Sequence, residues 1–243
     1  VLRTVIEDDL HHPGACHLYI HATESSQRPE LGLPCAETLG ATVPVASHIR
    51  HMPSHTWNEV GLWDRSVRAN TAARAADRAA REDRGFSYAP THNLHMLLFA
   101  ASFDGQGDVA MQAGRDYREL SGDAIFEVLT LLRFGHFDAI LAHGDRPGSA
   151  VSGAIWDFAR GYAALRTGDR AEAARQRDRV LAFARDTDER FRFHPAGPLL
   201  GSLGHLLAGE ILRGDEDLDG AGEAFERAVA LEDELAYDEP EPL

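Results

Sequence analysis

The chain has 243 residues, of which 44% are hydrophobic and 26% charged, a balance typical of folded rather than disordered proteins. Its 24 basic and 39 acidic side chains give a formal net charge of −15, so its surface repels phosphate backbones and we expect no nucleic-acid partner. The longest apolar runs are far too short to cross a bilayer, and we therefore expect no membrane partner either.

The predicted elements are helices that recur along the chain. Two His-x-x-x-His segments, His17–His21 and His51–His55, lie 34 positions apart, which is the period of tetratricopeptide repeats. The second is followed by Gly61 and by two small residues, Ser66 and Ala73, which suit a tight turn and a close helix contact. Later copies of this turn pattern contain Gly105, Gly135, Gly168 and, in the last copy, Gly209 with Ala221 and Ala228.

This pattern predicts an all-α fold, a tetratricopeptide-like α-solenoid of about six helix pairs that form a concave groove. The pairs are expected to begin near residues 13, 47, 91, 121, 154 and 202. We predict one array over residues 1–243, with histidine-bearing repeats in 11–119 and the remaining repeats in 120–236. Residues 1–10 resemble the second helix of an incomplete pair, so the chain is expected to be part of a longer array with another chain or copy at its open repeat ends.

Two irregular stretches interrupt the period. Residues 83–89 are predicted to be an inserted loop, and residues 186–198 a connector or, as the alternative, a lid. The only two cysteines, Cys16 and Cys35, do not make a disulfide framework, which predicts a reducing compartment and a cytoplasmic location.

Eight of the thirteen histidines fall into three clusters. Residues three or four apart project from one face of a helix, so each cluster predicts a stripe on the first helix of its pair, facing the groove. Imidazoles from neighbouring helices could then converge on one or two metal ions. A proton-handling or anion-binding cluster, or inert groove residues, are the alternatives. We predict as metal ligands His17, His21, His51, His55, His92 and His95, with His12, His48 and Glu59 as possible additional ligands.

The donor set favours copper first, and zinc or iron next, because imidazole suits these metals and six imidazoles could hold two ions with about three each. Cys16 lies around the helix from His17 and is predicted to pack rather than to bind metal. Glu24 lies on the first histidine stripe and is the predicted catalytic residue, as a ligand, a general base or a group that orients an imidazole.

The segments His12-Pro-Gly-Ala-Cys-His17-Leu-Tyr-Ile-His21-Ala-Thr-Glu24, His51-Met-Pro-Ser-His55 and His92-Asn-Leu-His95 together resemble a bacterial family of tetratricopeptide-repeat proteins, as does Tyr237-Asp-Glu-Pro240. The resemblance covers most of residues 1–240. It implies the repeat fold and the importance of the histidines, but no particular activity. Family chains are about twice as long, which also implies a partial chain.

Three functions remain open from the sequence. The first is a copper-type oxidoreductase that acts on a small molecule or a peptide in the groove, with a metal-dependent hydrolase as its nearest variant. The second is a non-catalytic scaffold that binds peptides or proteins in the groove. The third is a protein that stores or delivers metal.

Overall fold

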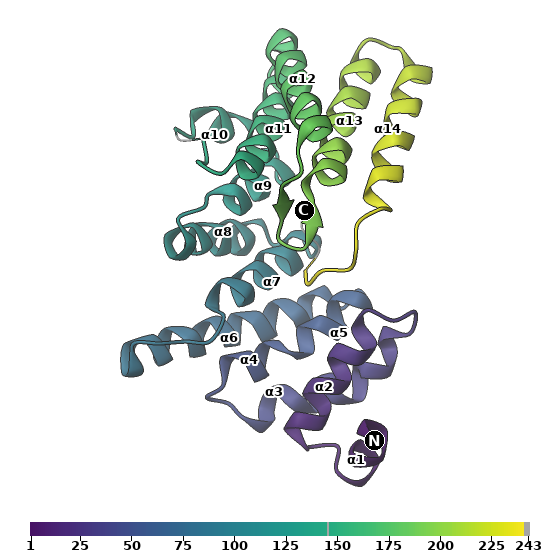
Figure 1. Ribbon diagram of the computed structural model, residues 1–243. Coiled ribbons are helices and arrows are strands. Elements are labelled where there is room, and N and C mark those ends of the chain that lie inside the picture. The colour runs from purple at the N-terminus through teal and green to yellow at the C-terminus, as the bar shows by residue number, and fades with distance from the viewer. Residues whose placement is uncertain (145, 241–243) are drawn as a thin grey trace. The chain divides into compact units, whose positions relative to one another are not determined.

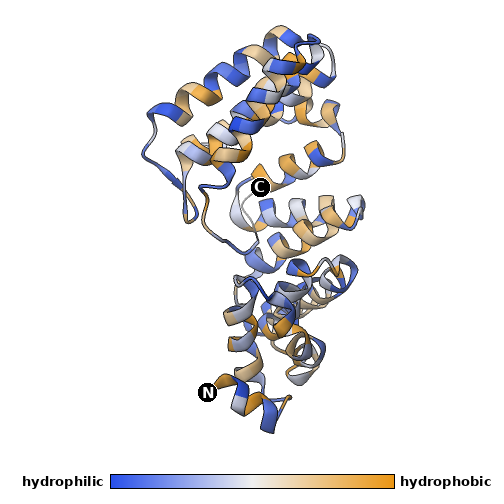
Figure 2. Cartoon of the chain, turned by 90° about the vertical axis from the view of Figure 1, so that its right-hand side faces the viewer, coloured by the Kyte–Doolittle hydropathy of each residue, from blue (hydrophilic) through white to orange (hydrophobic). Residues whose placement is uncertain are grey.

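Helices make up nearly all of the regular structure. The computed structural model describes residues 1–144 and 146–240, and within them the only strands are the two-residue β1 (Arg190–Phe191) and β2 (His194–Pro195). Figure 1 shows the helices in chain order, and Figure 2 shows hydrophilic and hydrophobic residues alternating along them, as amphipathic helices require. The all-α prediction is confirmed.

The chain forms two compact units, of which the first spans Val1–Gly122 and the second begins at Asp123. In the first unit a short helix precedes three helix pairs. Consecutive helices pack against each other, as in a solenoid. The elements are α1 (Leu2–Asp8), α2 (Pro13–Glu24), the 3-10 helix η1 (Pro29–Gly32), α3 (Leu33–Thr42), α4 (Ser47–His51), α5 (Pro53–Glu59), α6 (Trp63–Arg84), α7 (Pro90–Phe103) and α8 (Gly107–Ser121).

The second unit repeats the arrangement with three further pairs, and its consecutive helices also pack together. Its helices are α9 (Ile125–Arg133), α10 (Phe137–Ala142), α11 (Ala150–Arg166), α12 (Arg170–Asp186), α13 (Ala196–Gly214) and α14 (Leu218–Glu232). None of the helices within the described residues combines the length and the apolar character that crossing a membrane requires.

The predicted helix pairs are all found, with starts that differ from the prediction by a few residues. The largest difference is in the last pair, which begins at Ala196 instead of near 202, because the Gly197-Pro198 dipeptide lies in the first turn of α13, where proline is tolerated. The hairpin β1–β2 occupies the middle of the stretch predicted to be a connector. The predicted loop 83–89 is shorter than expected, since α6 continues to Arg84 and ends at the left-handed Gly85.

From the second pair onward, the turns between paired helices share one hydrogen-bond pattern. A residue with positive φ is followed by an amide that donates to the carbonyl five positions earlier, which closes the helix C-terminus. Gly61 has φ of 74°, and Leu62 N donates to Trp57 O at 2.8 Å. The same pattern occurs at Gly105, Gly135 and Gly168, as the sequence predicts.

The last turn does not follow the sequence prediction. Glu216, with φ of 63°, takes the left-handed position, and Asp217 N donates to Leu212 O at 3.1 Å. Gly209 lies instead inside α13, where an added Cβ would meet the ring of Phe225 on α14. The prediction of a turn at Gly209 is therefore wrong, because this glycine serves the close approach of two helices.

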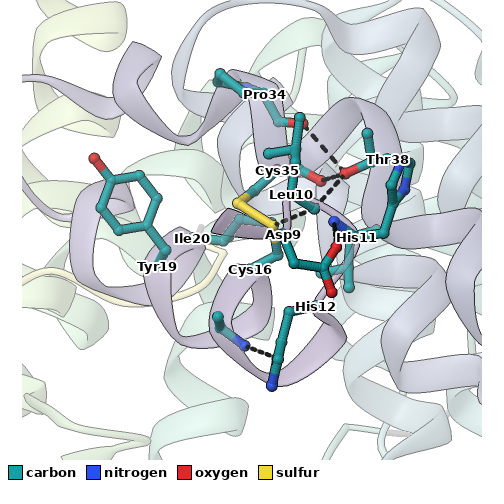
Figure 3. The surroundings of a disulfide bond; sticks show 12 residues. Asp9, Leu10, His11, His12, Cys16, Tyr19, Ile20, Pro34, Cys35 and Thr38 are labelled. Atoms are coloured by element: carbon teal, nitrogen blue, oxygen red, sulfur yellow. Dashed lines mark hydrogen bonds between the residues drawn. A yellow bond between two sulfur atoms is a disulfide. The ribbon is translucent and has the colours of Figure 1, made fainter. Parts of the chain in front are cut away.

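The first unit contains a disulfide between Cys16 on α2 and Cys35 on α3 (Figure 3). Both cysteines are 1% exposed and lie in a core with Ile20, Leu39 and Met52. The prediction that the two cysteines do not form a disulfide is wrong, and the argument for a reducing compartment is lost with it. Cys16 and His17 are neighbours in the chain, but successive helical residues point in different directions, so one reaches the core and the other the histidine face.

Candidate metal centre

The histidine-rich helices all belong to the first unit. Helix α2 carries His17, His21 and Glu24, α4 carries His48 and His51, α5 carries His55, and α7 carries His92 and His95. Helices α4 and α5 are separated by Met52 alone, whose φ and ψ are helical, so Pro53 interrupts the hydrogen bonds without turning the chain. The stripe over His48, His51 and His55 therefore continues through the proline, as predicted.

Three of these side chains form what we call the outer group, which consists of His17, His21 and His48. One possible ligand atom from each lies within 4.8 Å of the others. The Nε2 atoms of His17 and His48 are 3.2 Å apart, and the ring of His21 is 5.0 Å from that of His17 between centroids. All three side chains are partly exposed, and the side chain of His21 is 31% exposed, so the outer group is open to small molecules.

A second set, the inner group, consists of His51, His55 and His92, and its ligand atoms also lie within 4.8 Å of one another. The Nε2 atoms of His51 and His55 are 3.2 Å apart, and the ring of His92 is 4.7 Å from that of His51. His51 is completely buried and His55 is 2% exposed. The inner group is therefore largely closed to solvent.

The separation of the Nε2 atoms suits a shared metal ion. Imidazole nitrogens bind Zn²⁺ at about 2.0–2.1 Å, and two such ligands at a tetrahedral angle are about 3.3 Å apart. Both pairs of Nε2 atoms, His17 with His48 and His51 with His55, have nearly this spacing. Each group thus offers a nearly formed pair of ligands and a third imidazole beside it.

Glu24 connects the two groups. Its Oε1 lies 2.6 Å from Nδ1 of His21, and its Oε2 lies 2.5 Å from Nδ1 of His55. Burial alone would raise the pKa of Glu24, but the hydrogen bonds and charges of His21 and His55 outweigh it and lower this pKa to about 2. The carboxylate is therefore ionised at neutral pH, and both of its oxygens are used by imidazoles.

His51 occupies the most buried position of the site. Its pKa is well below the ordinary value, first because burial penalises the charged ring, and then because His55, His92 and His48 are close to it. The side chain of Asn70 acts in the opposite direction and raises this pKa. His51 is therefore neutral, as a metal ligand must be.

Asn70 on α6 is a residue near the site that the sequence analysis does not identify. It is fully buried, and its amide nitrogen donates to Ser66 O at 3.0 Å. Its side chain influences the pKa of His51, and the Nε2 atom of His51 faces His55. No local sequence pattern marks Asn70, because it reaches the site from the second helix of its pair.

Three predicted residues lie outside the two groups. His12 caps α2, with its Nδ1 accepting from Ala15 N at 3.1 Å. Glu59 is exposed at the end of α5. His95 is buried against Tyr117, with ring centroids 6.3 Å apart, and within the described residues it belongs to neither three-histidine group. His92 and His95 are three residues apart on α7, so their directions differ by about 60° around the helix axis. Only His92 reaches His51 and His55.

The outer group also has an aromatic neighbour that sequence reasoning missed. Tyr88, in the loop between α6 and α7, has its ring 5.1 Å from that of His48 and is 60% exposed. The inserted loop that the sequence predicts is therefore close to the metal groups. Its position follows from the long α6, which returns the chain to the start of α7.

The donor set is one of imidazoles. Several groups of histidine and glutamate side chains could hold a metal ion, and the two three-histidine groups contain no thiolate, because both cysteines are in the disulfide. Imidazole ligands suit copper, zinc, iron and nickel. The arrangement therefore indicates a transition metal and does not by itself select one.

Comparison with known proteins adds no assignment. No family model matches this sequence, and no curated protein matches it. The resemblance to the tetratricopeptide-repeat family stays a prediction that rests on the histidine segments and the helix-pair period.

Proposed function

We propose that this chain is a tetratricopeptide-type array that binds two transition-metal ions, one in each three-histidine group, and that copper is the preferred metal. The observation that carries the proposal is the presence of two three-imidazole sets whose ligand atoms lie within 4.8 Å of one another. Their rings also adjoin each other, with 5.0 Å between the centroids of His21 and His55 and 5.1 Å between those of His48 and His51.

The choice of copper rests on what the site offers and on what it lacks. Among divalent first-row metals, copper binds nitrogen ligands most tightly. Non-haem iron usually takes a carboxylate together with two imidazoles, but both oxygens of Glu24 already accept hydrogen bonds. Structural zinc is usually closed by four ligands that include cysteine, and here the cysteines are paired. Zinc and iron rank next.

With copper in both groups, the activity we propose is that of an oxidoreductase that uses dioxygen. A substrate at the outer group would lose two electrons and two protons, and dioxygen would gain them to form hydrogen peroxide. Two neighbouring one-electron ions suit this two-electron exchange. A small molecule or a peptide segment could reach the outer group beside His21, which is partly exposed, while the inner group is protected from bulk water.

The occupied carboxylate makes a hydrolase the weaker candidate. A metal-dependent hydrolase needs a base close to the metal-bound water. Of the two carboxylates that the sequence points to, Glu59 is exposed at the end of α5, and Glu24 lies among the imidazoles. Both of its oxygens are held by imidazoles, so its proposed role is to orient ligands and not to move protons.

The compartment of the protein and its partner chain are also matters of proposal. The Cys16–Cys35 disulfide favours an oxidising compartment over the cytoplasm expected from the sequence, since disulfides persist where thiols are not kept reduced. A second chain or copy at the ends of the repeat array stays a prediction.

The test is oxygen uptake by protein loaded separately with copper, iron or zinc and offered phenols, amines and short peptides as electron donors. We expect the copper form to consume dioxygen and release one equivalent of peroxide per donor oxidised, and the zinc form to do neither. The variant His51→Gln should lose this activity, while His95→Gln should keep it. Absence of uptake with every redox metal would contradict the oxidoreductase. Peptide affinity that persists in a chelator would instead support the scaffold.

A further inference from the structure

Glu24 is placed so that one carboxylate serves ligands of both metal groups. It lies on α2, is 4% exposed, and reaches His21 of the outer group through Oε1 and His55 of the inner group through Oε2. His21 is three residues away on the same helix, whereas His55 comes from α5, 31 positions along the chain. These two hydrogen bonds join the two groups through a common partner.

The hydrogen-bonding capacity of a carboxylate decides which ring nitrogen carries the proton. An ionised carboxylate only accepts, so both imidazoles must donate to it from Nδ1. In a neutral imidazole the other nitrogen then has no proton, so the lone pair that a metal ion would need is on Nε2 of His21 and Nε2 of His55. In the inner group this is also the nitrogen of His55 that faces His51, at 3.2 Å.

We propose that Glu24 is a positioning residue that couples the two groups, by holding one ligand of each in the tautomer that binds metal through Nε2. The effect of Glu24 on metal binding rests on the proposed function, whereas the tautomers are a property of the metal-free protein. An ion that binds His55 strengthens the hydrogen bond from its Nδ1 to Glu24.

The substitution Glu24→Gln removes one of the two acceptor oxygens and so tests whether both imidazoles depend on Glu24. A glutamine side chain has nearly the same shape, but it offers one acceptor oxygen and one donor nitrogen in place of two acceptors. The oxygen can serve only one imidazole, and the amide nitrogen must face the other, which then has to accept at Nδ1 and carry its proton on Nε2. That imidazole can no longer bind metal in its present orientation.

The burial of the two imidazoles predicts which of them changes its tautomer in Glu24→Gln. The side chain of His55 is 1% exposed and that of His21 is 31% exposed. His55 has less access to water as a replacement partner, so it should keep the glutamine oxygen. His21 should then take the Nε2–H tautomer. The outer group would lose its ion and the inner group would keep its own.

The experiment combines two measurements on Glu24→Gln, with Glu59→Gln as the matched control, since Glu59 is an exposed carboxylate of the same unit. Nitrogen-15 NMR of the imidazoles in the metal-free protein reports the tautomer of each histidine. We expect His21 and His55 to be Nδ1–H in the wild type and in the control, and His21 to become Nε2–H in Glu24→Gln. Elemental analysis after loading with copper should give two ions for the first two proteins and one for Glu24→Gln.

The NMR result decides the proposal without reference to metal. If both imidazoles remain Nδ1–H in Glu24→Gln, or if either is Nε2–H in the wild type, Glu24 does not set the tautomers and the coupling is wrong. If the tautomers behave as expected but the wild type binds no metal, the proposed function fails and the hydrogen-bond relationship stands. Retention of two ions by Glu24→Gln with wild-type affinity would also contradict the coupling, because loss of such a partner costs metal affinity about 10–100-fold.

Discussion

The Nε2 atoms of His17 and His48 face each other at 3.2 Å, although 31 positions separate the two residues in the chain. His17 comes from α2 and His48 from the first turn of α4. Two imidazoles so placed repel each other when both are protonated. When they are not both protonated, the two Nε2 atoms can share one proton or bind one metal ion. Both side chains are partly exposed, so the pair lies on the open side of the candidate metal centre.

His48 should bind metal even though the sequence ranks it below the six principal candidates. Replacing His48 by Gln removes one of three outer imidazoles, and we expect the outer group to lose its ion while the inner group retains its own. His95→Gln should leave both ions in place, since His95 packs against Tyr117. Competition with a chromophoric chelator measures the two affinities. Loss of an ion in His95→Gln, with none lost in His48→Gln, would reverse this assignment.

Acid should destabilise the metal-free protein through His51. The pKa of this buried ring is well below its ordinary 6.5 in the folded protein, so below about pH 6.5 the unfolded chain binds a proton that the folded one does not. The contribution of His51 to stability is therefore complete above this pH and is lost as the pH falls, by up to about 1.4 kcal/mol per pH unit. The lowered pKa of Glu24, about 2 against 4.5, acts only below about pH 5.

The free energy of unfolding in urea at pH 7, 6 and 5 separates these contributions. The His51→Gln variant should show a pH dependence flatter by up to one proton over this range, whatever its stability at pH 7. An unchanged slope would mean that the protonation of His51 does not differ between the folded and unfolded states.

Reduction of the disulfide should destabilise the first unit. Cys16 and Cys35 are 19 positions apart, and a cross-link that closes a loop of this length contributes roughly 3 kcal/mol to stability. Since the chain has only these two cysteines, a variant with both replaced by alanine should lose a similar amount and should no longer respond to reductant. Thermal unfolding with and without reductant checks this. A wild-type melting temperature that reductant leaves unchanged would contradict it.

Gly209 should tolerate no side chain. An added Cβ meets the ring of Phe225, and crowding a packed helix contact costs typically about 1–3 kcal/mol. Gly222 on α14 is exposed, and a Cβ added to it would meet no other atom within 4 Å. Gly222→Ala should therefore be neutral or stabilising by up to about 1 kcal/mol. Urea unfolding of Gly209→Ala and Gly222→Ala compares the two. Equal stabilities would show that α13 and α14 do not approach closely at Gly209.

The helix pairs could be predicted because they depend on local chemistry. The turn glycines at 61, 105, 135 and 168 adopt positive φ, a conformation that favours glycine. A glycine that recurs at the expected spacing therefore marks such a turn in the sequence. The last turn escaped prediction because Glu216, and not a glycine, takes the left-handed conformation there. A neighbouring glycine with a packing role, Gly209, then fitted the pattern better than the true turn residue.

The membership of the metal groups could be predicted only in part. Helical spacing places His17 with His21 and His51 with His55, because residues four apart share a face. It cannot show that His92 reaches the centre while His95 turns to Tyr117, since this depends on how α7 rotates against α5 and α8. The disulfide was also hidden, because spacing along the chain does not reveal that α2 and α3 bring Cys16 and Cys35 together.

Elemental analysis of the protein, purified without a histidine tag and loaded with copper before excess metal is removed, tests the central claim most directly. We predict two ions per chain in the wild type, one in His51→Gln, and none in a variant that combines His51→Gln with His48→Gln. Electron paramagnetic resonance of the same samples should show nitrogen-ligated copper. A wild type that retains no stoichiometric metal, or a double variant that still holds two ions, would contradict the assignment of the two histidine groups as metal sites.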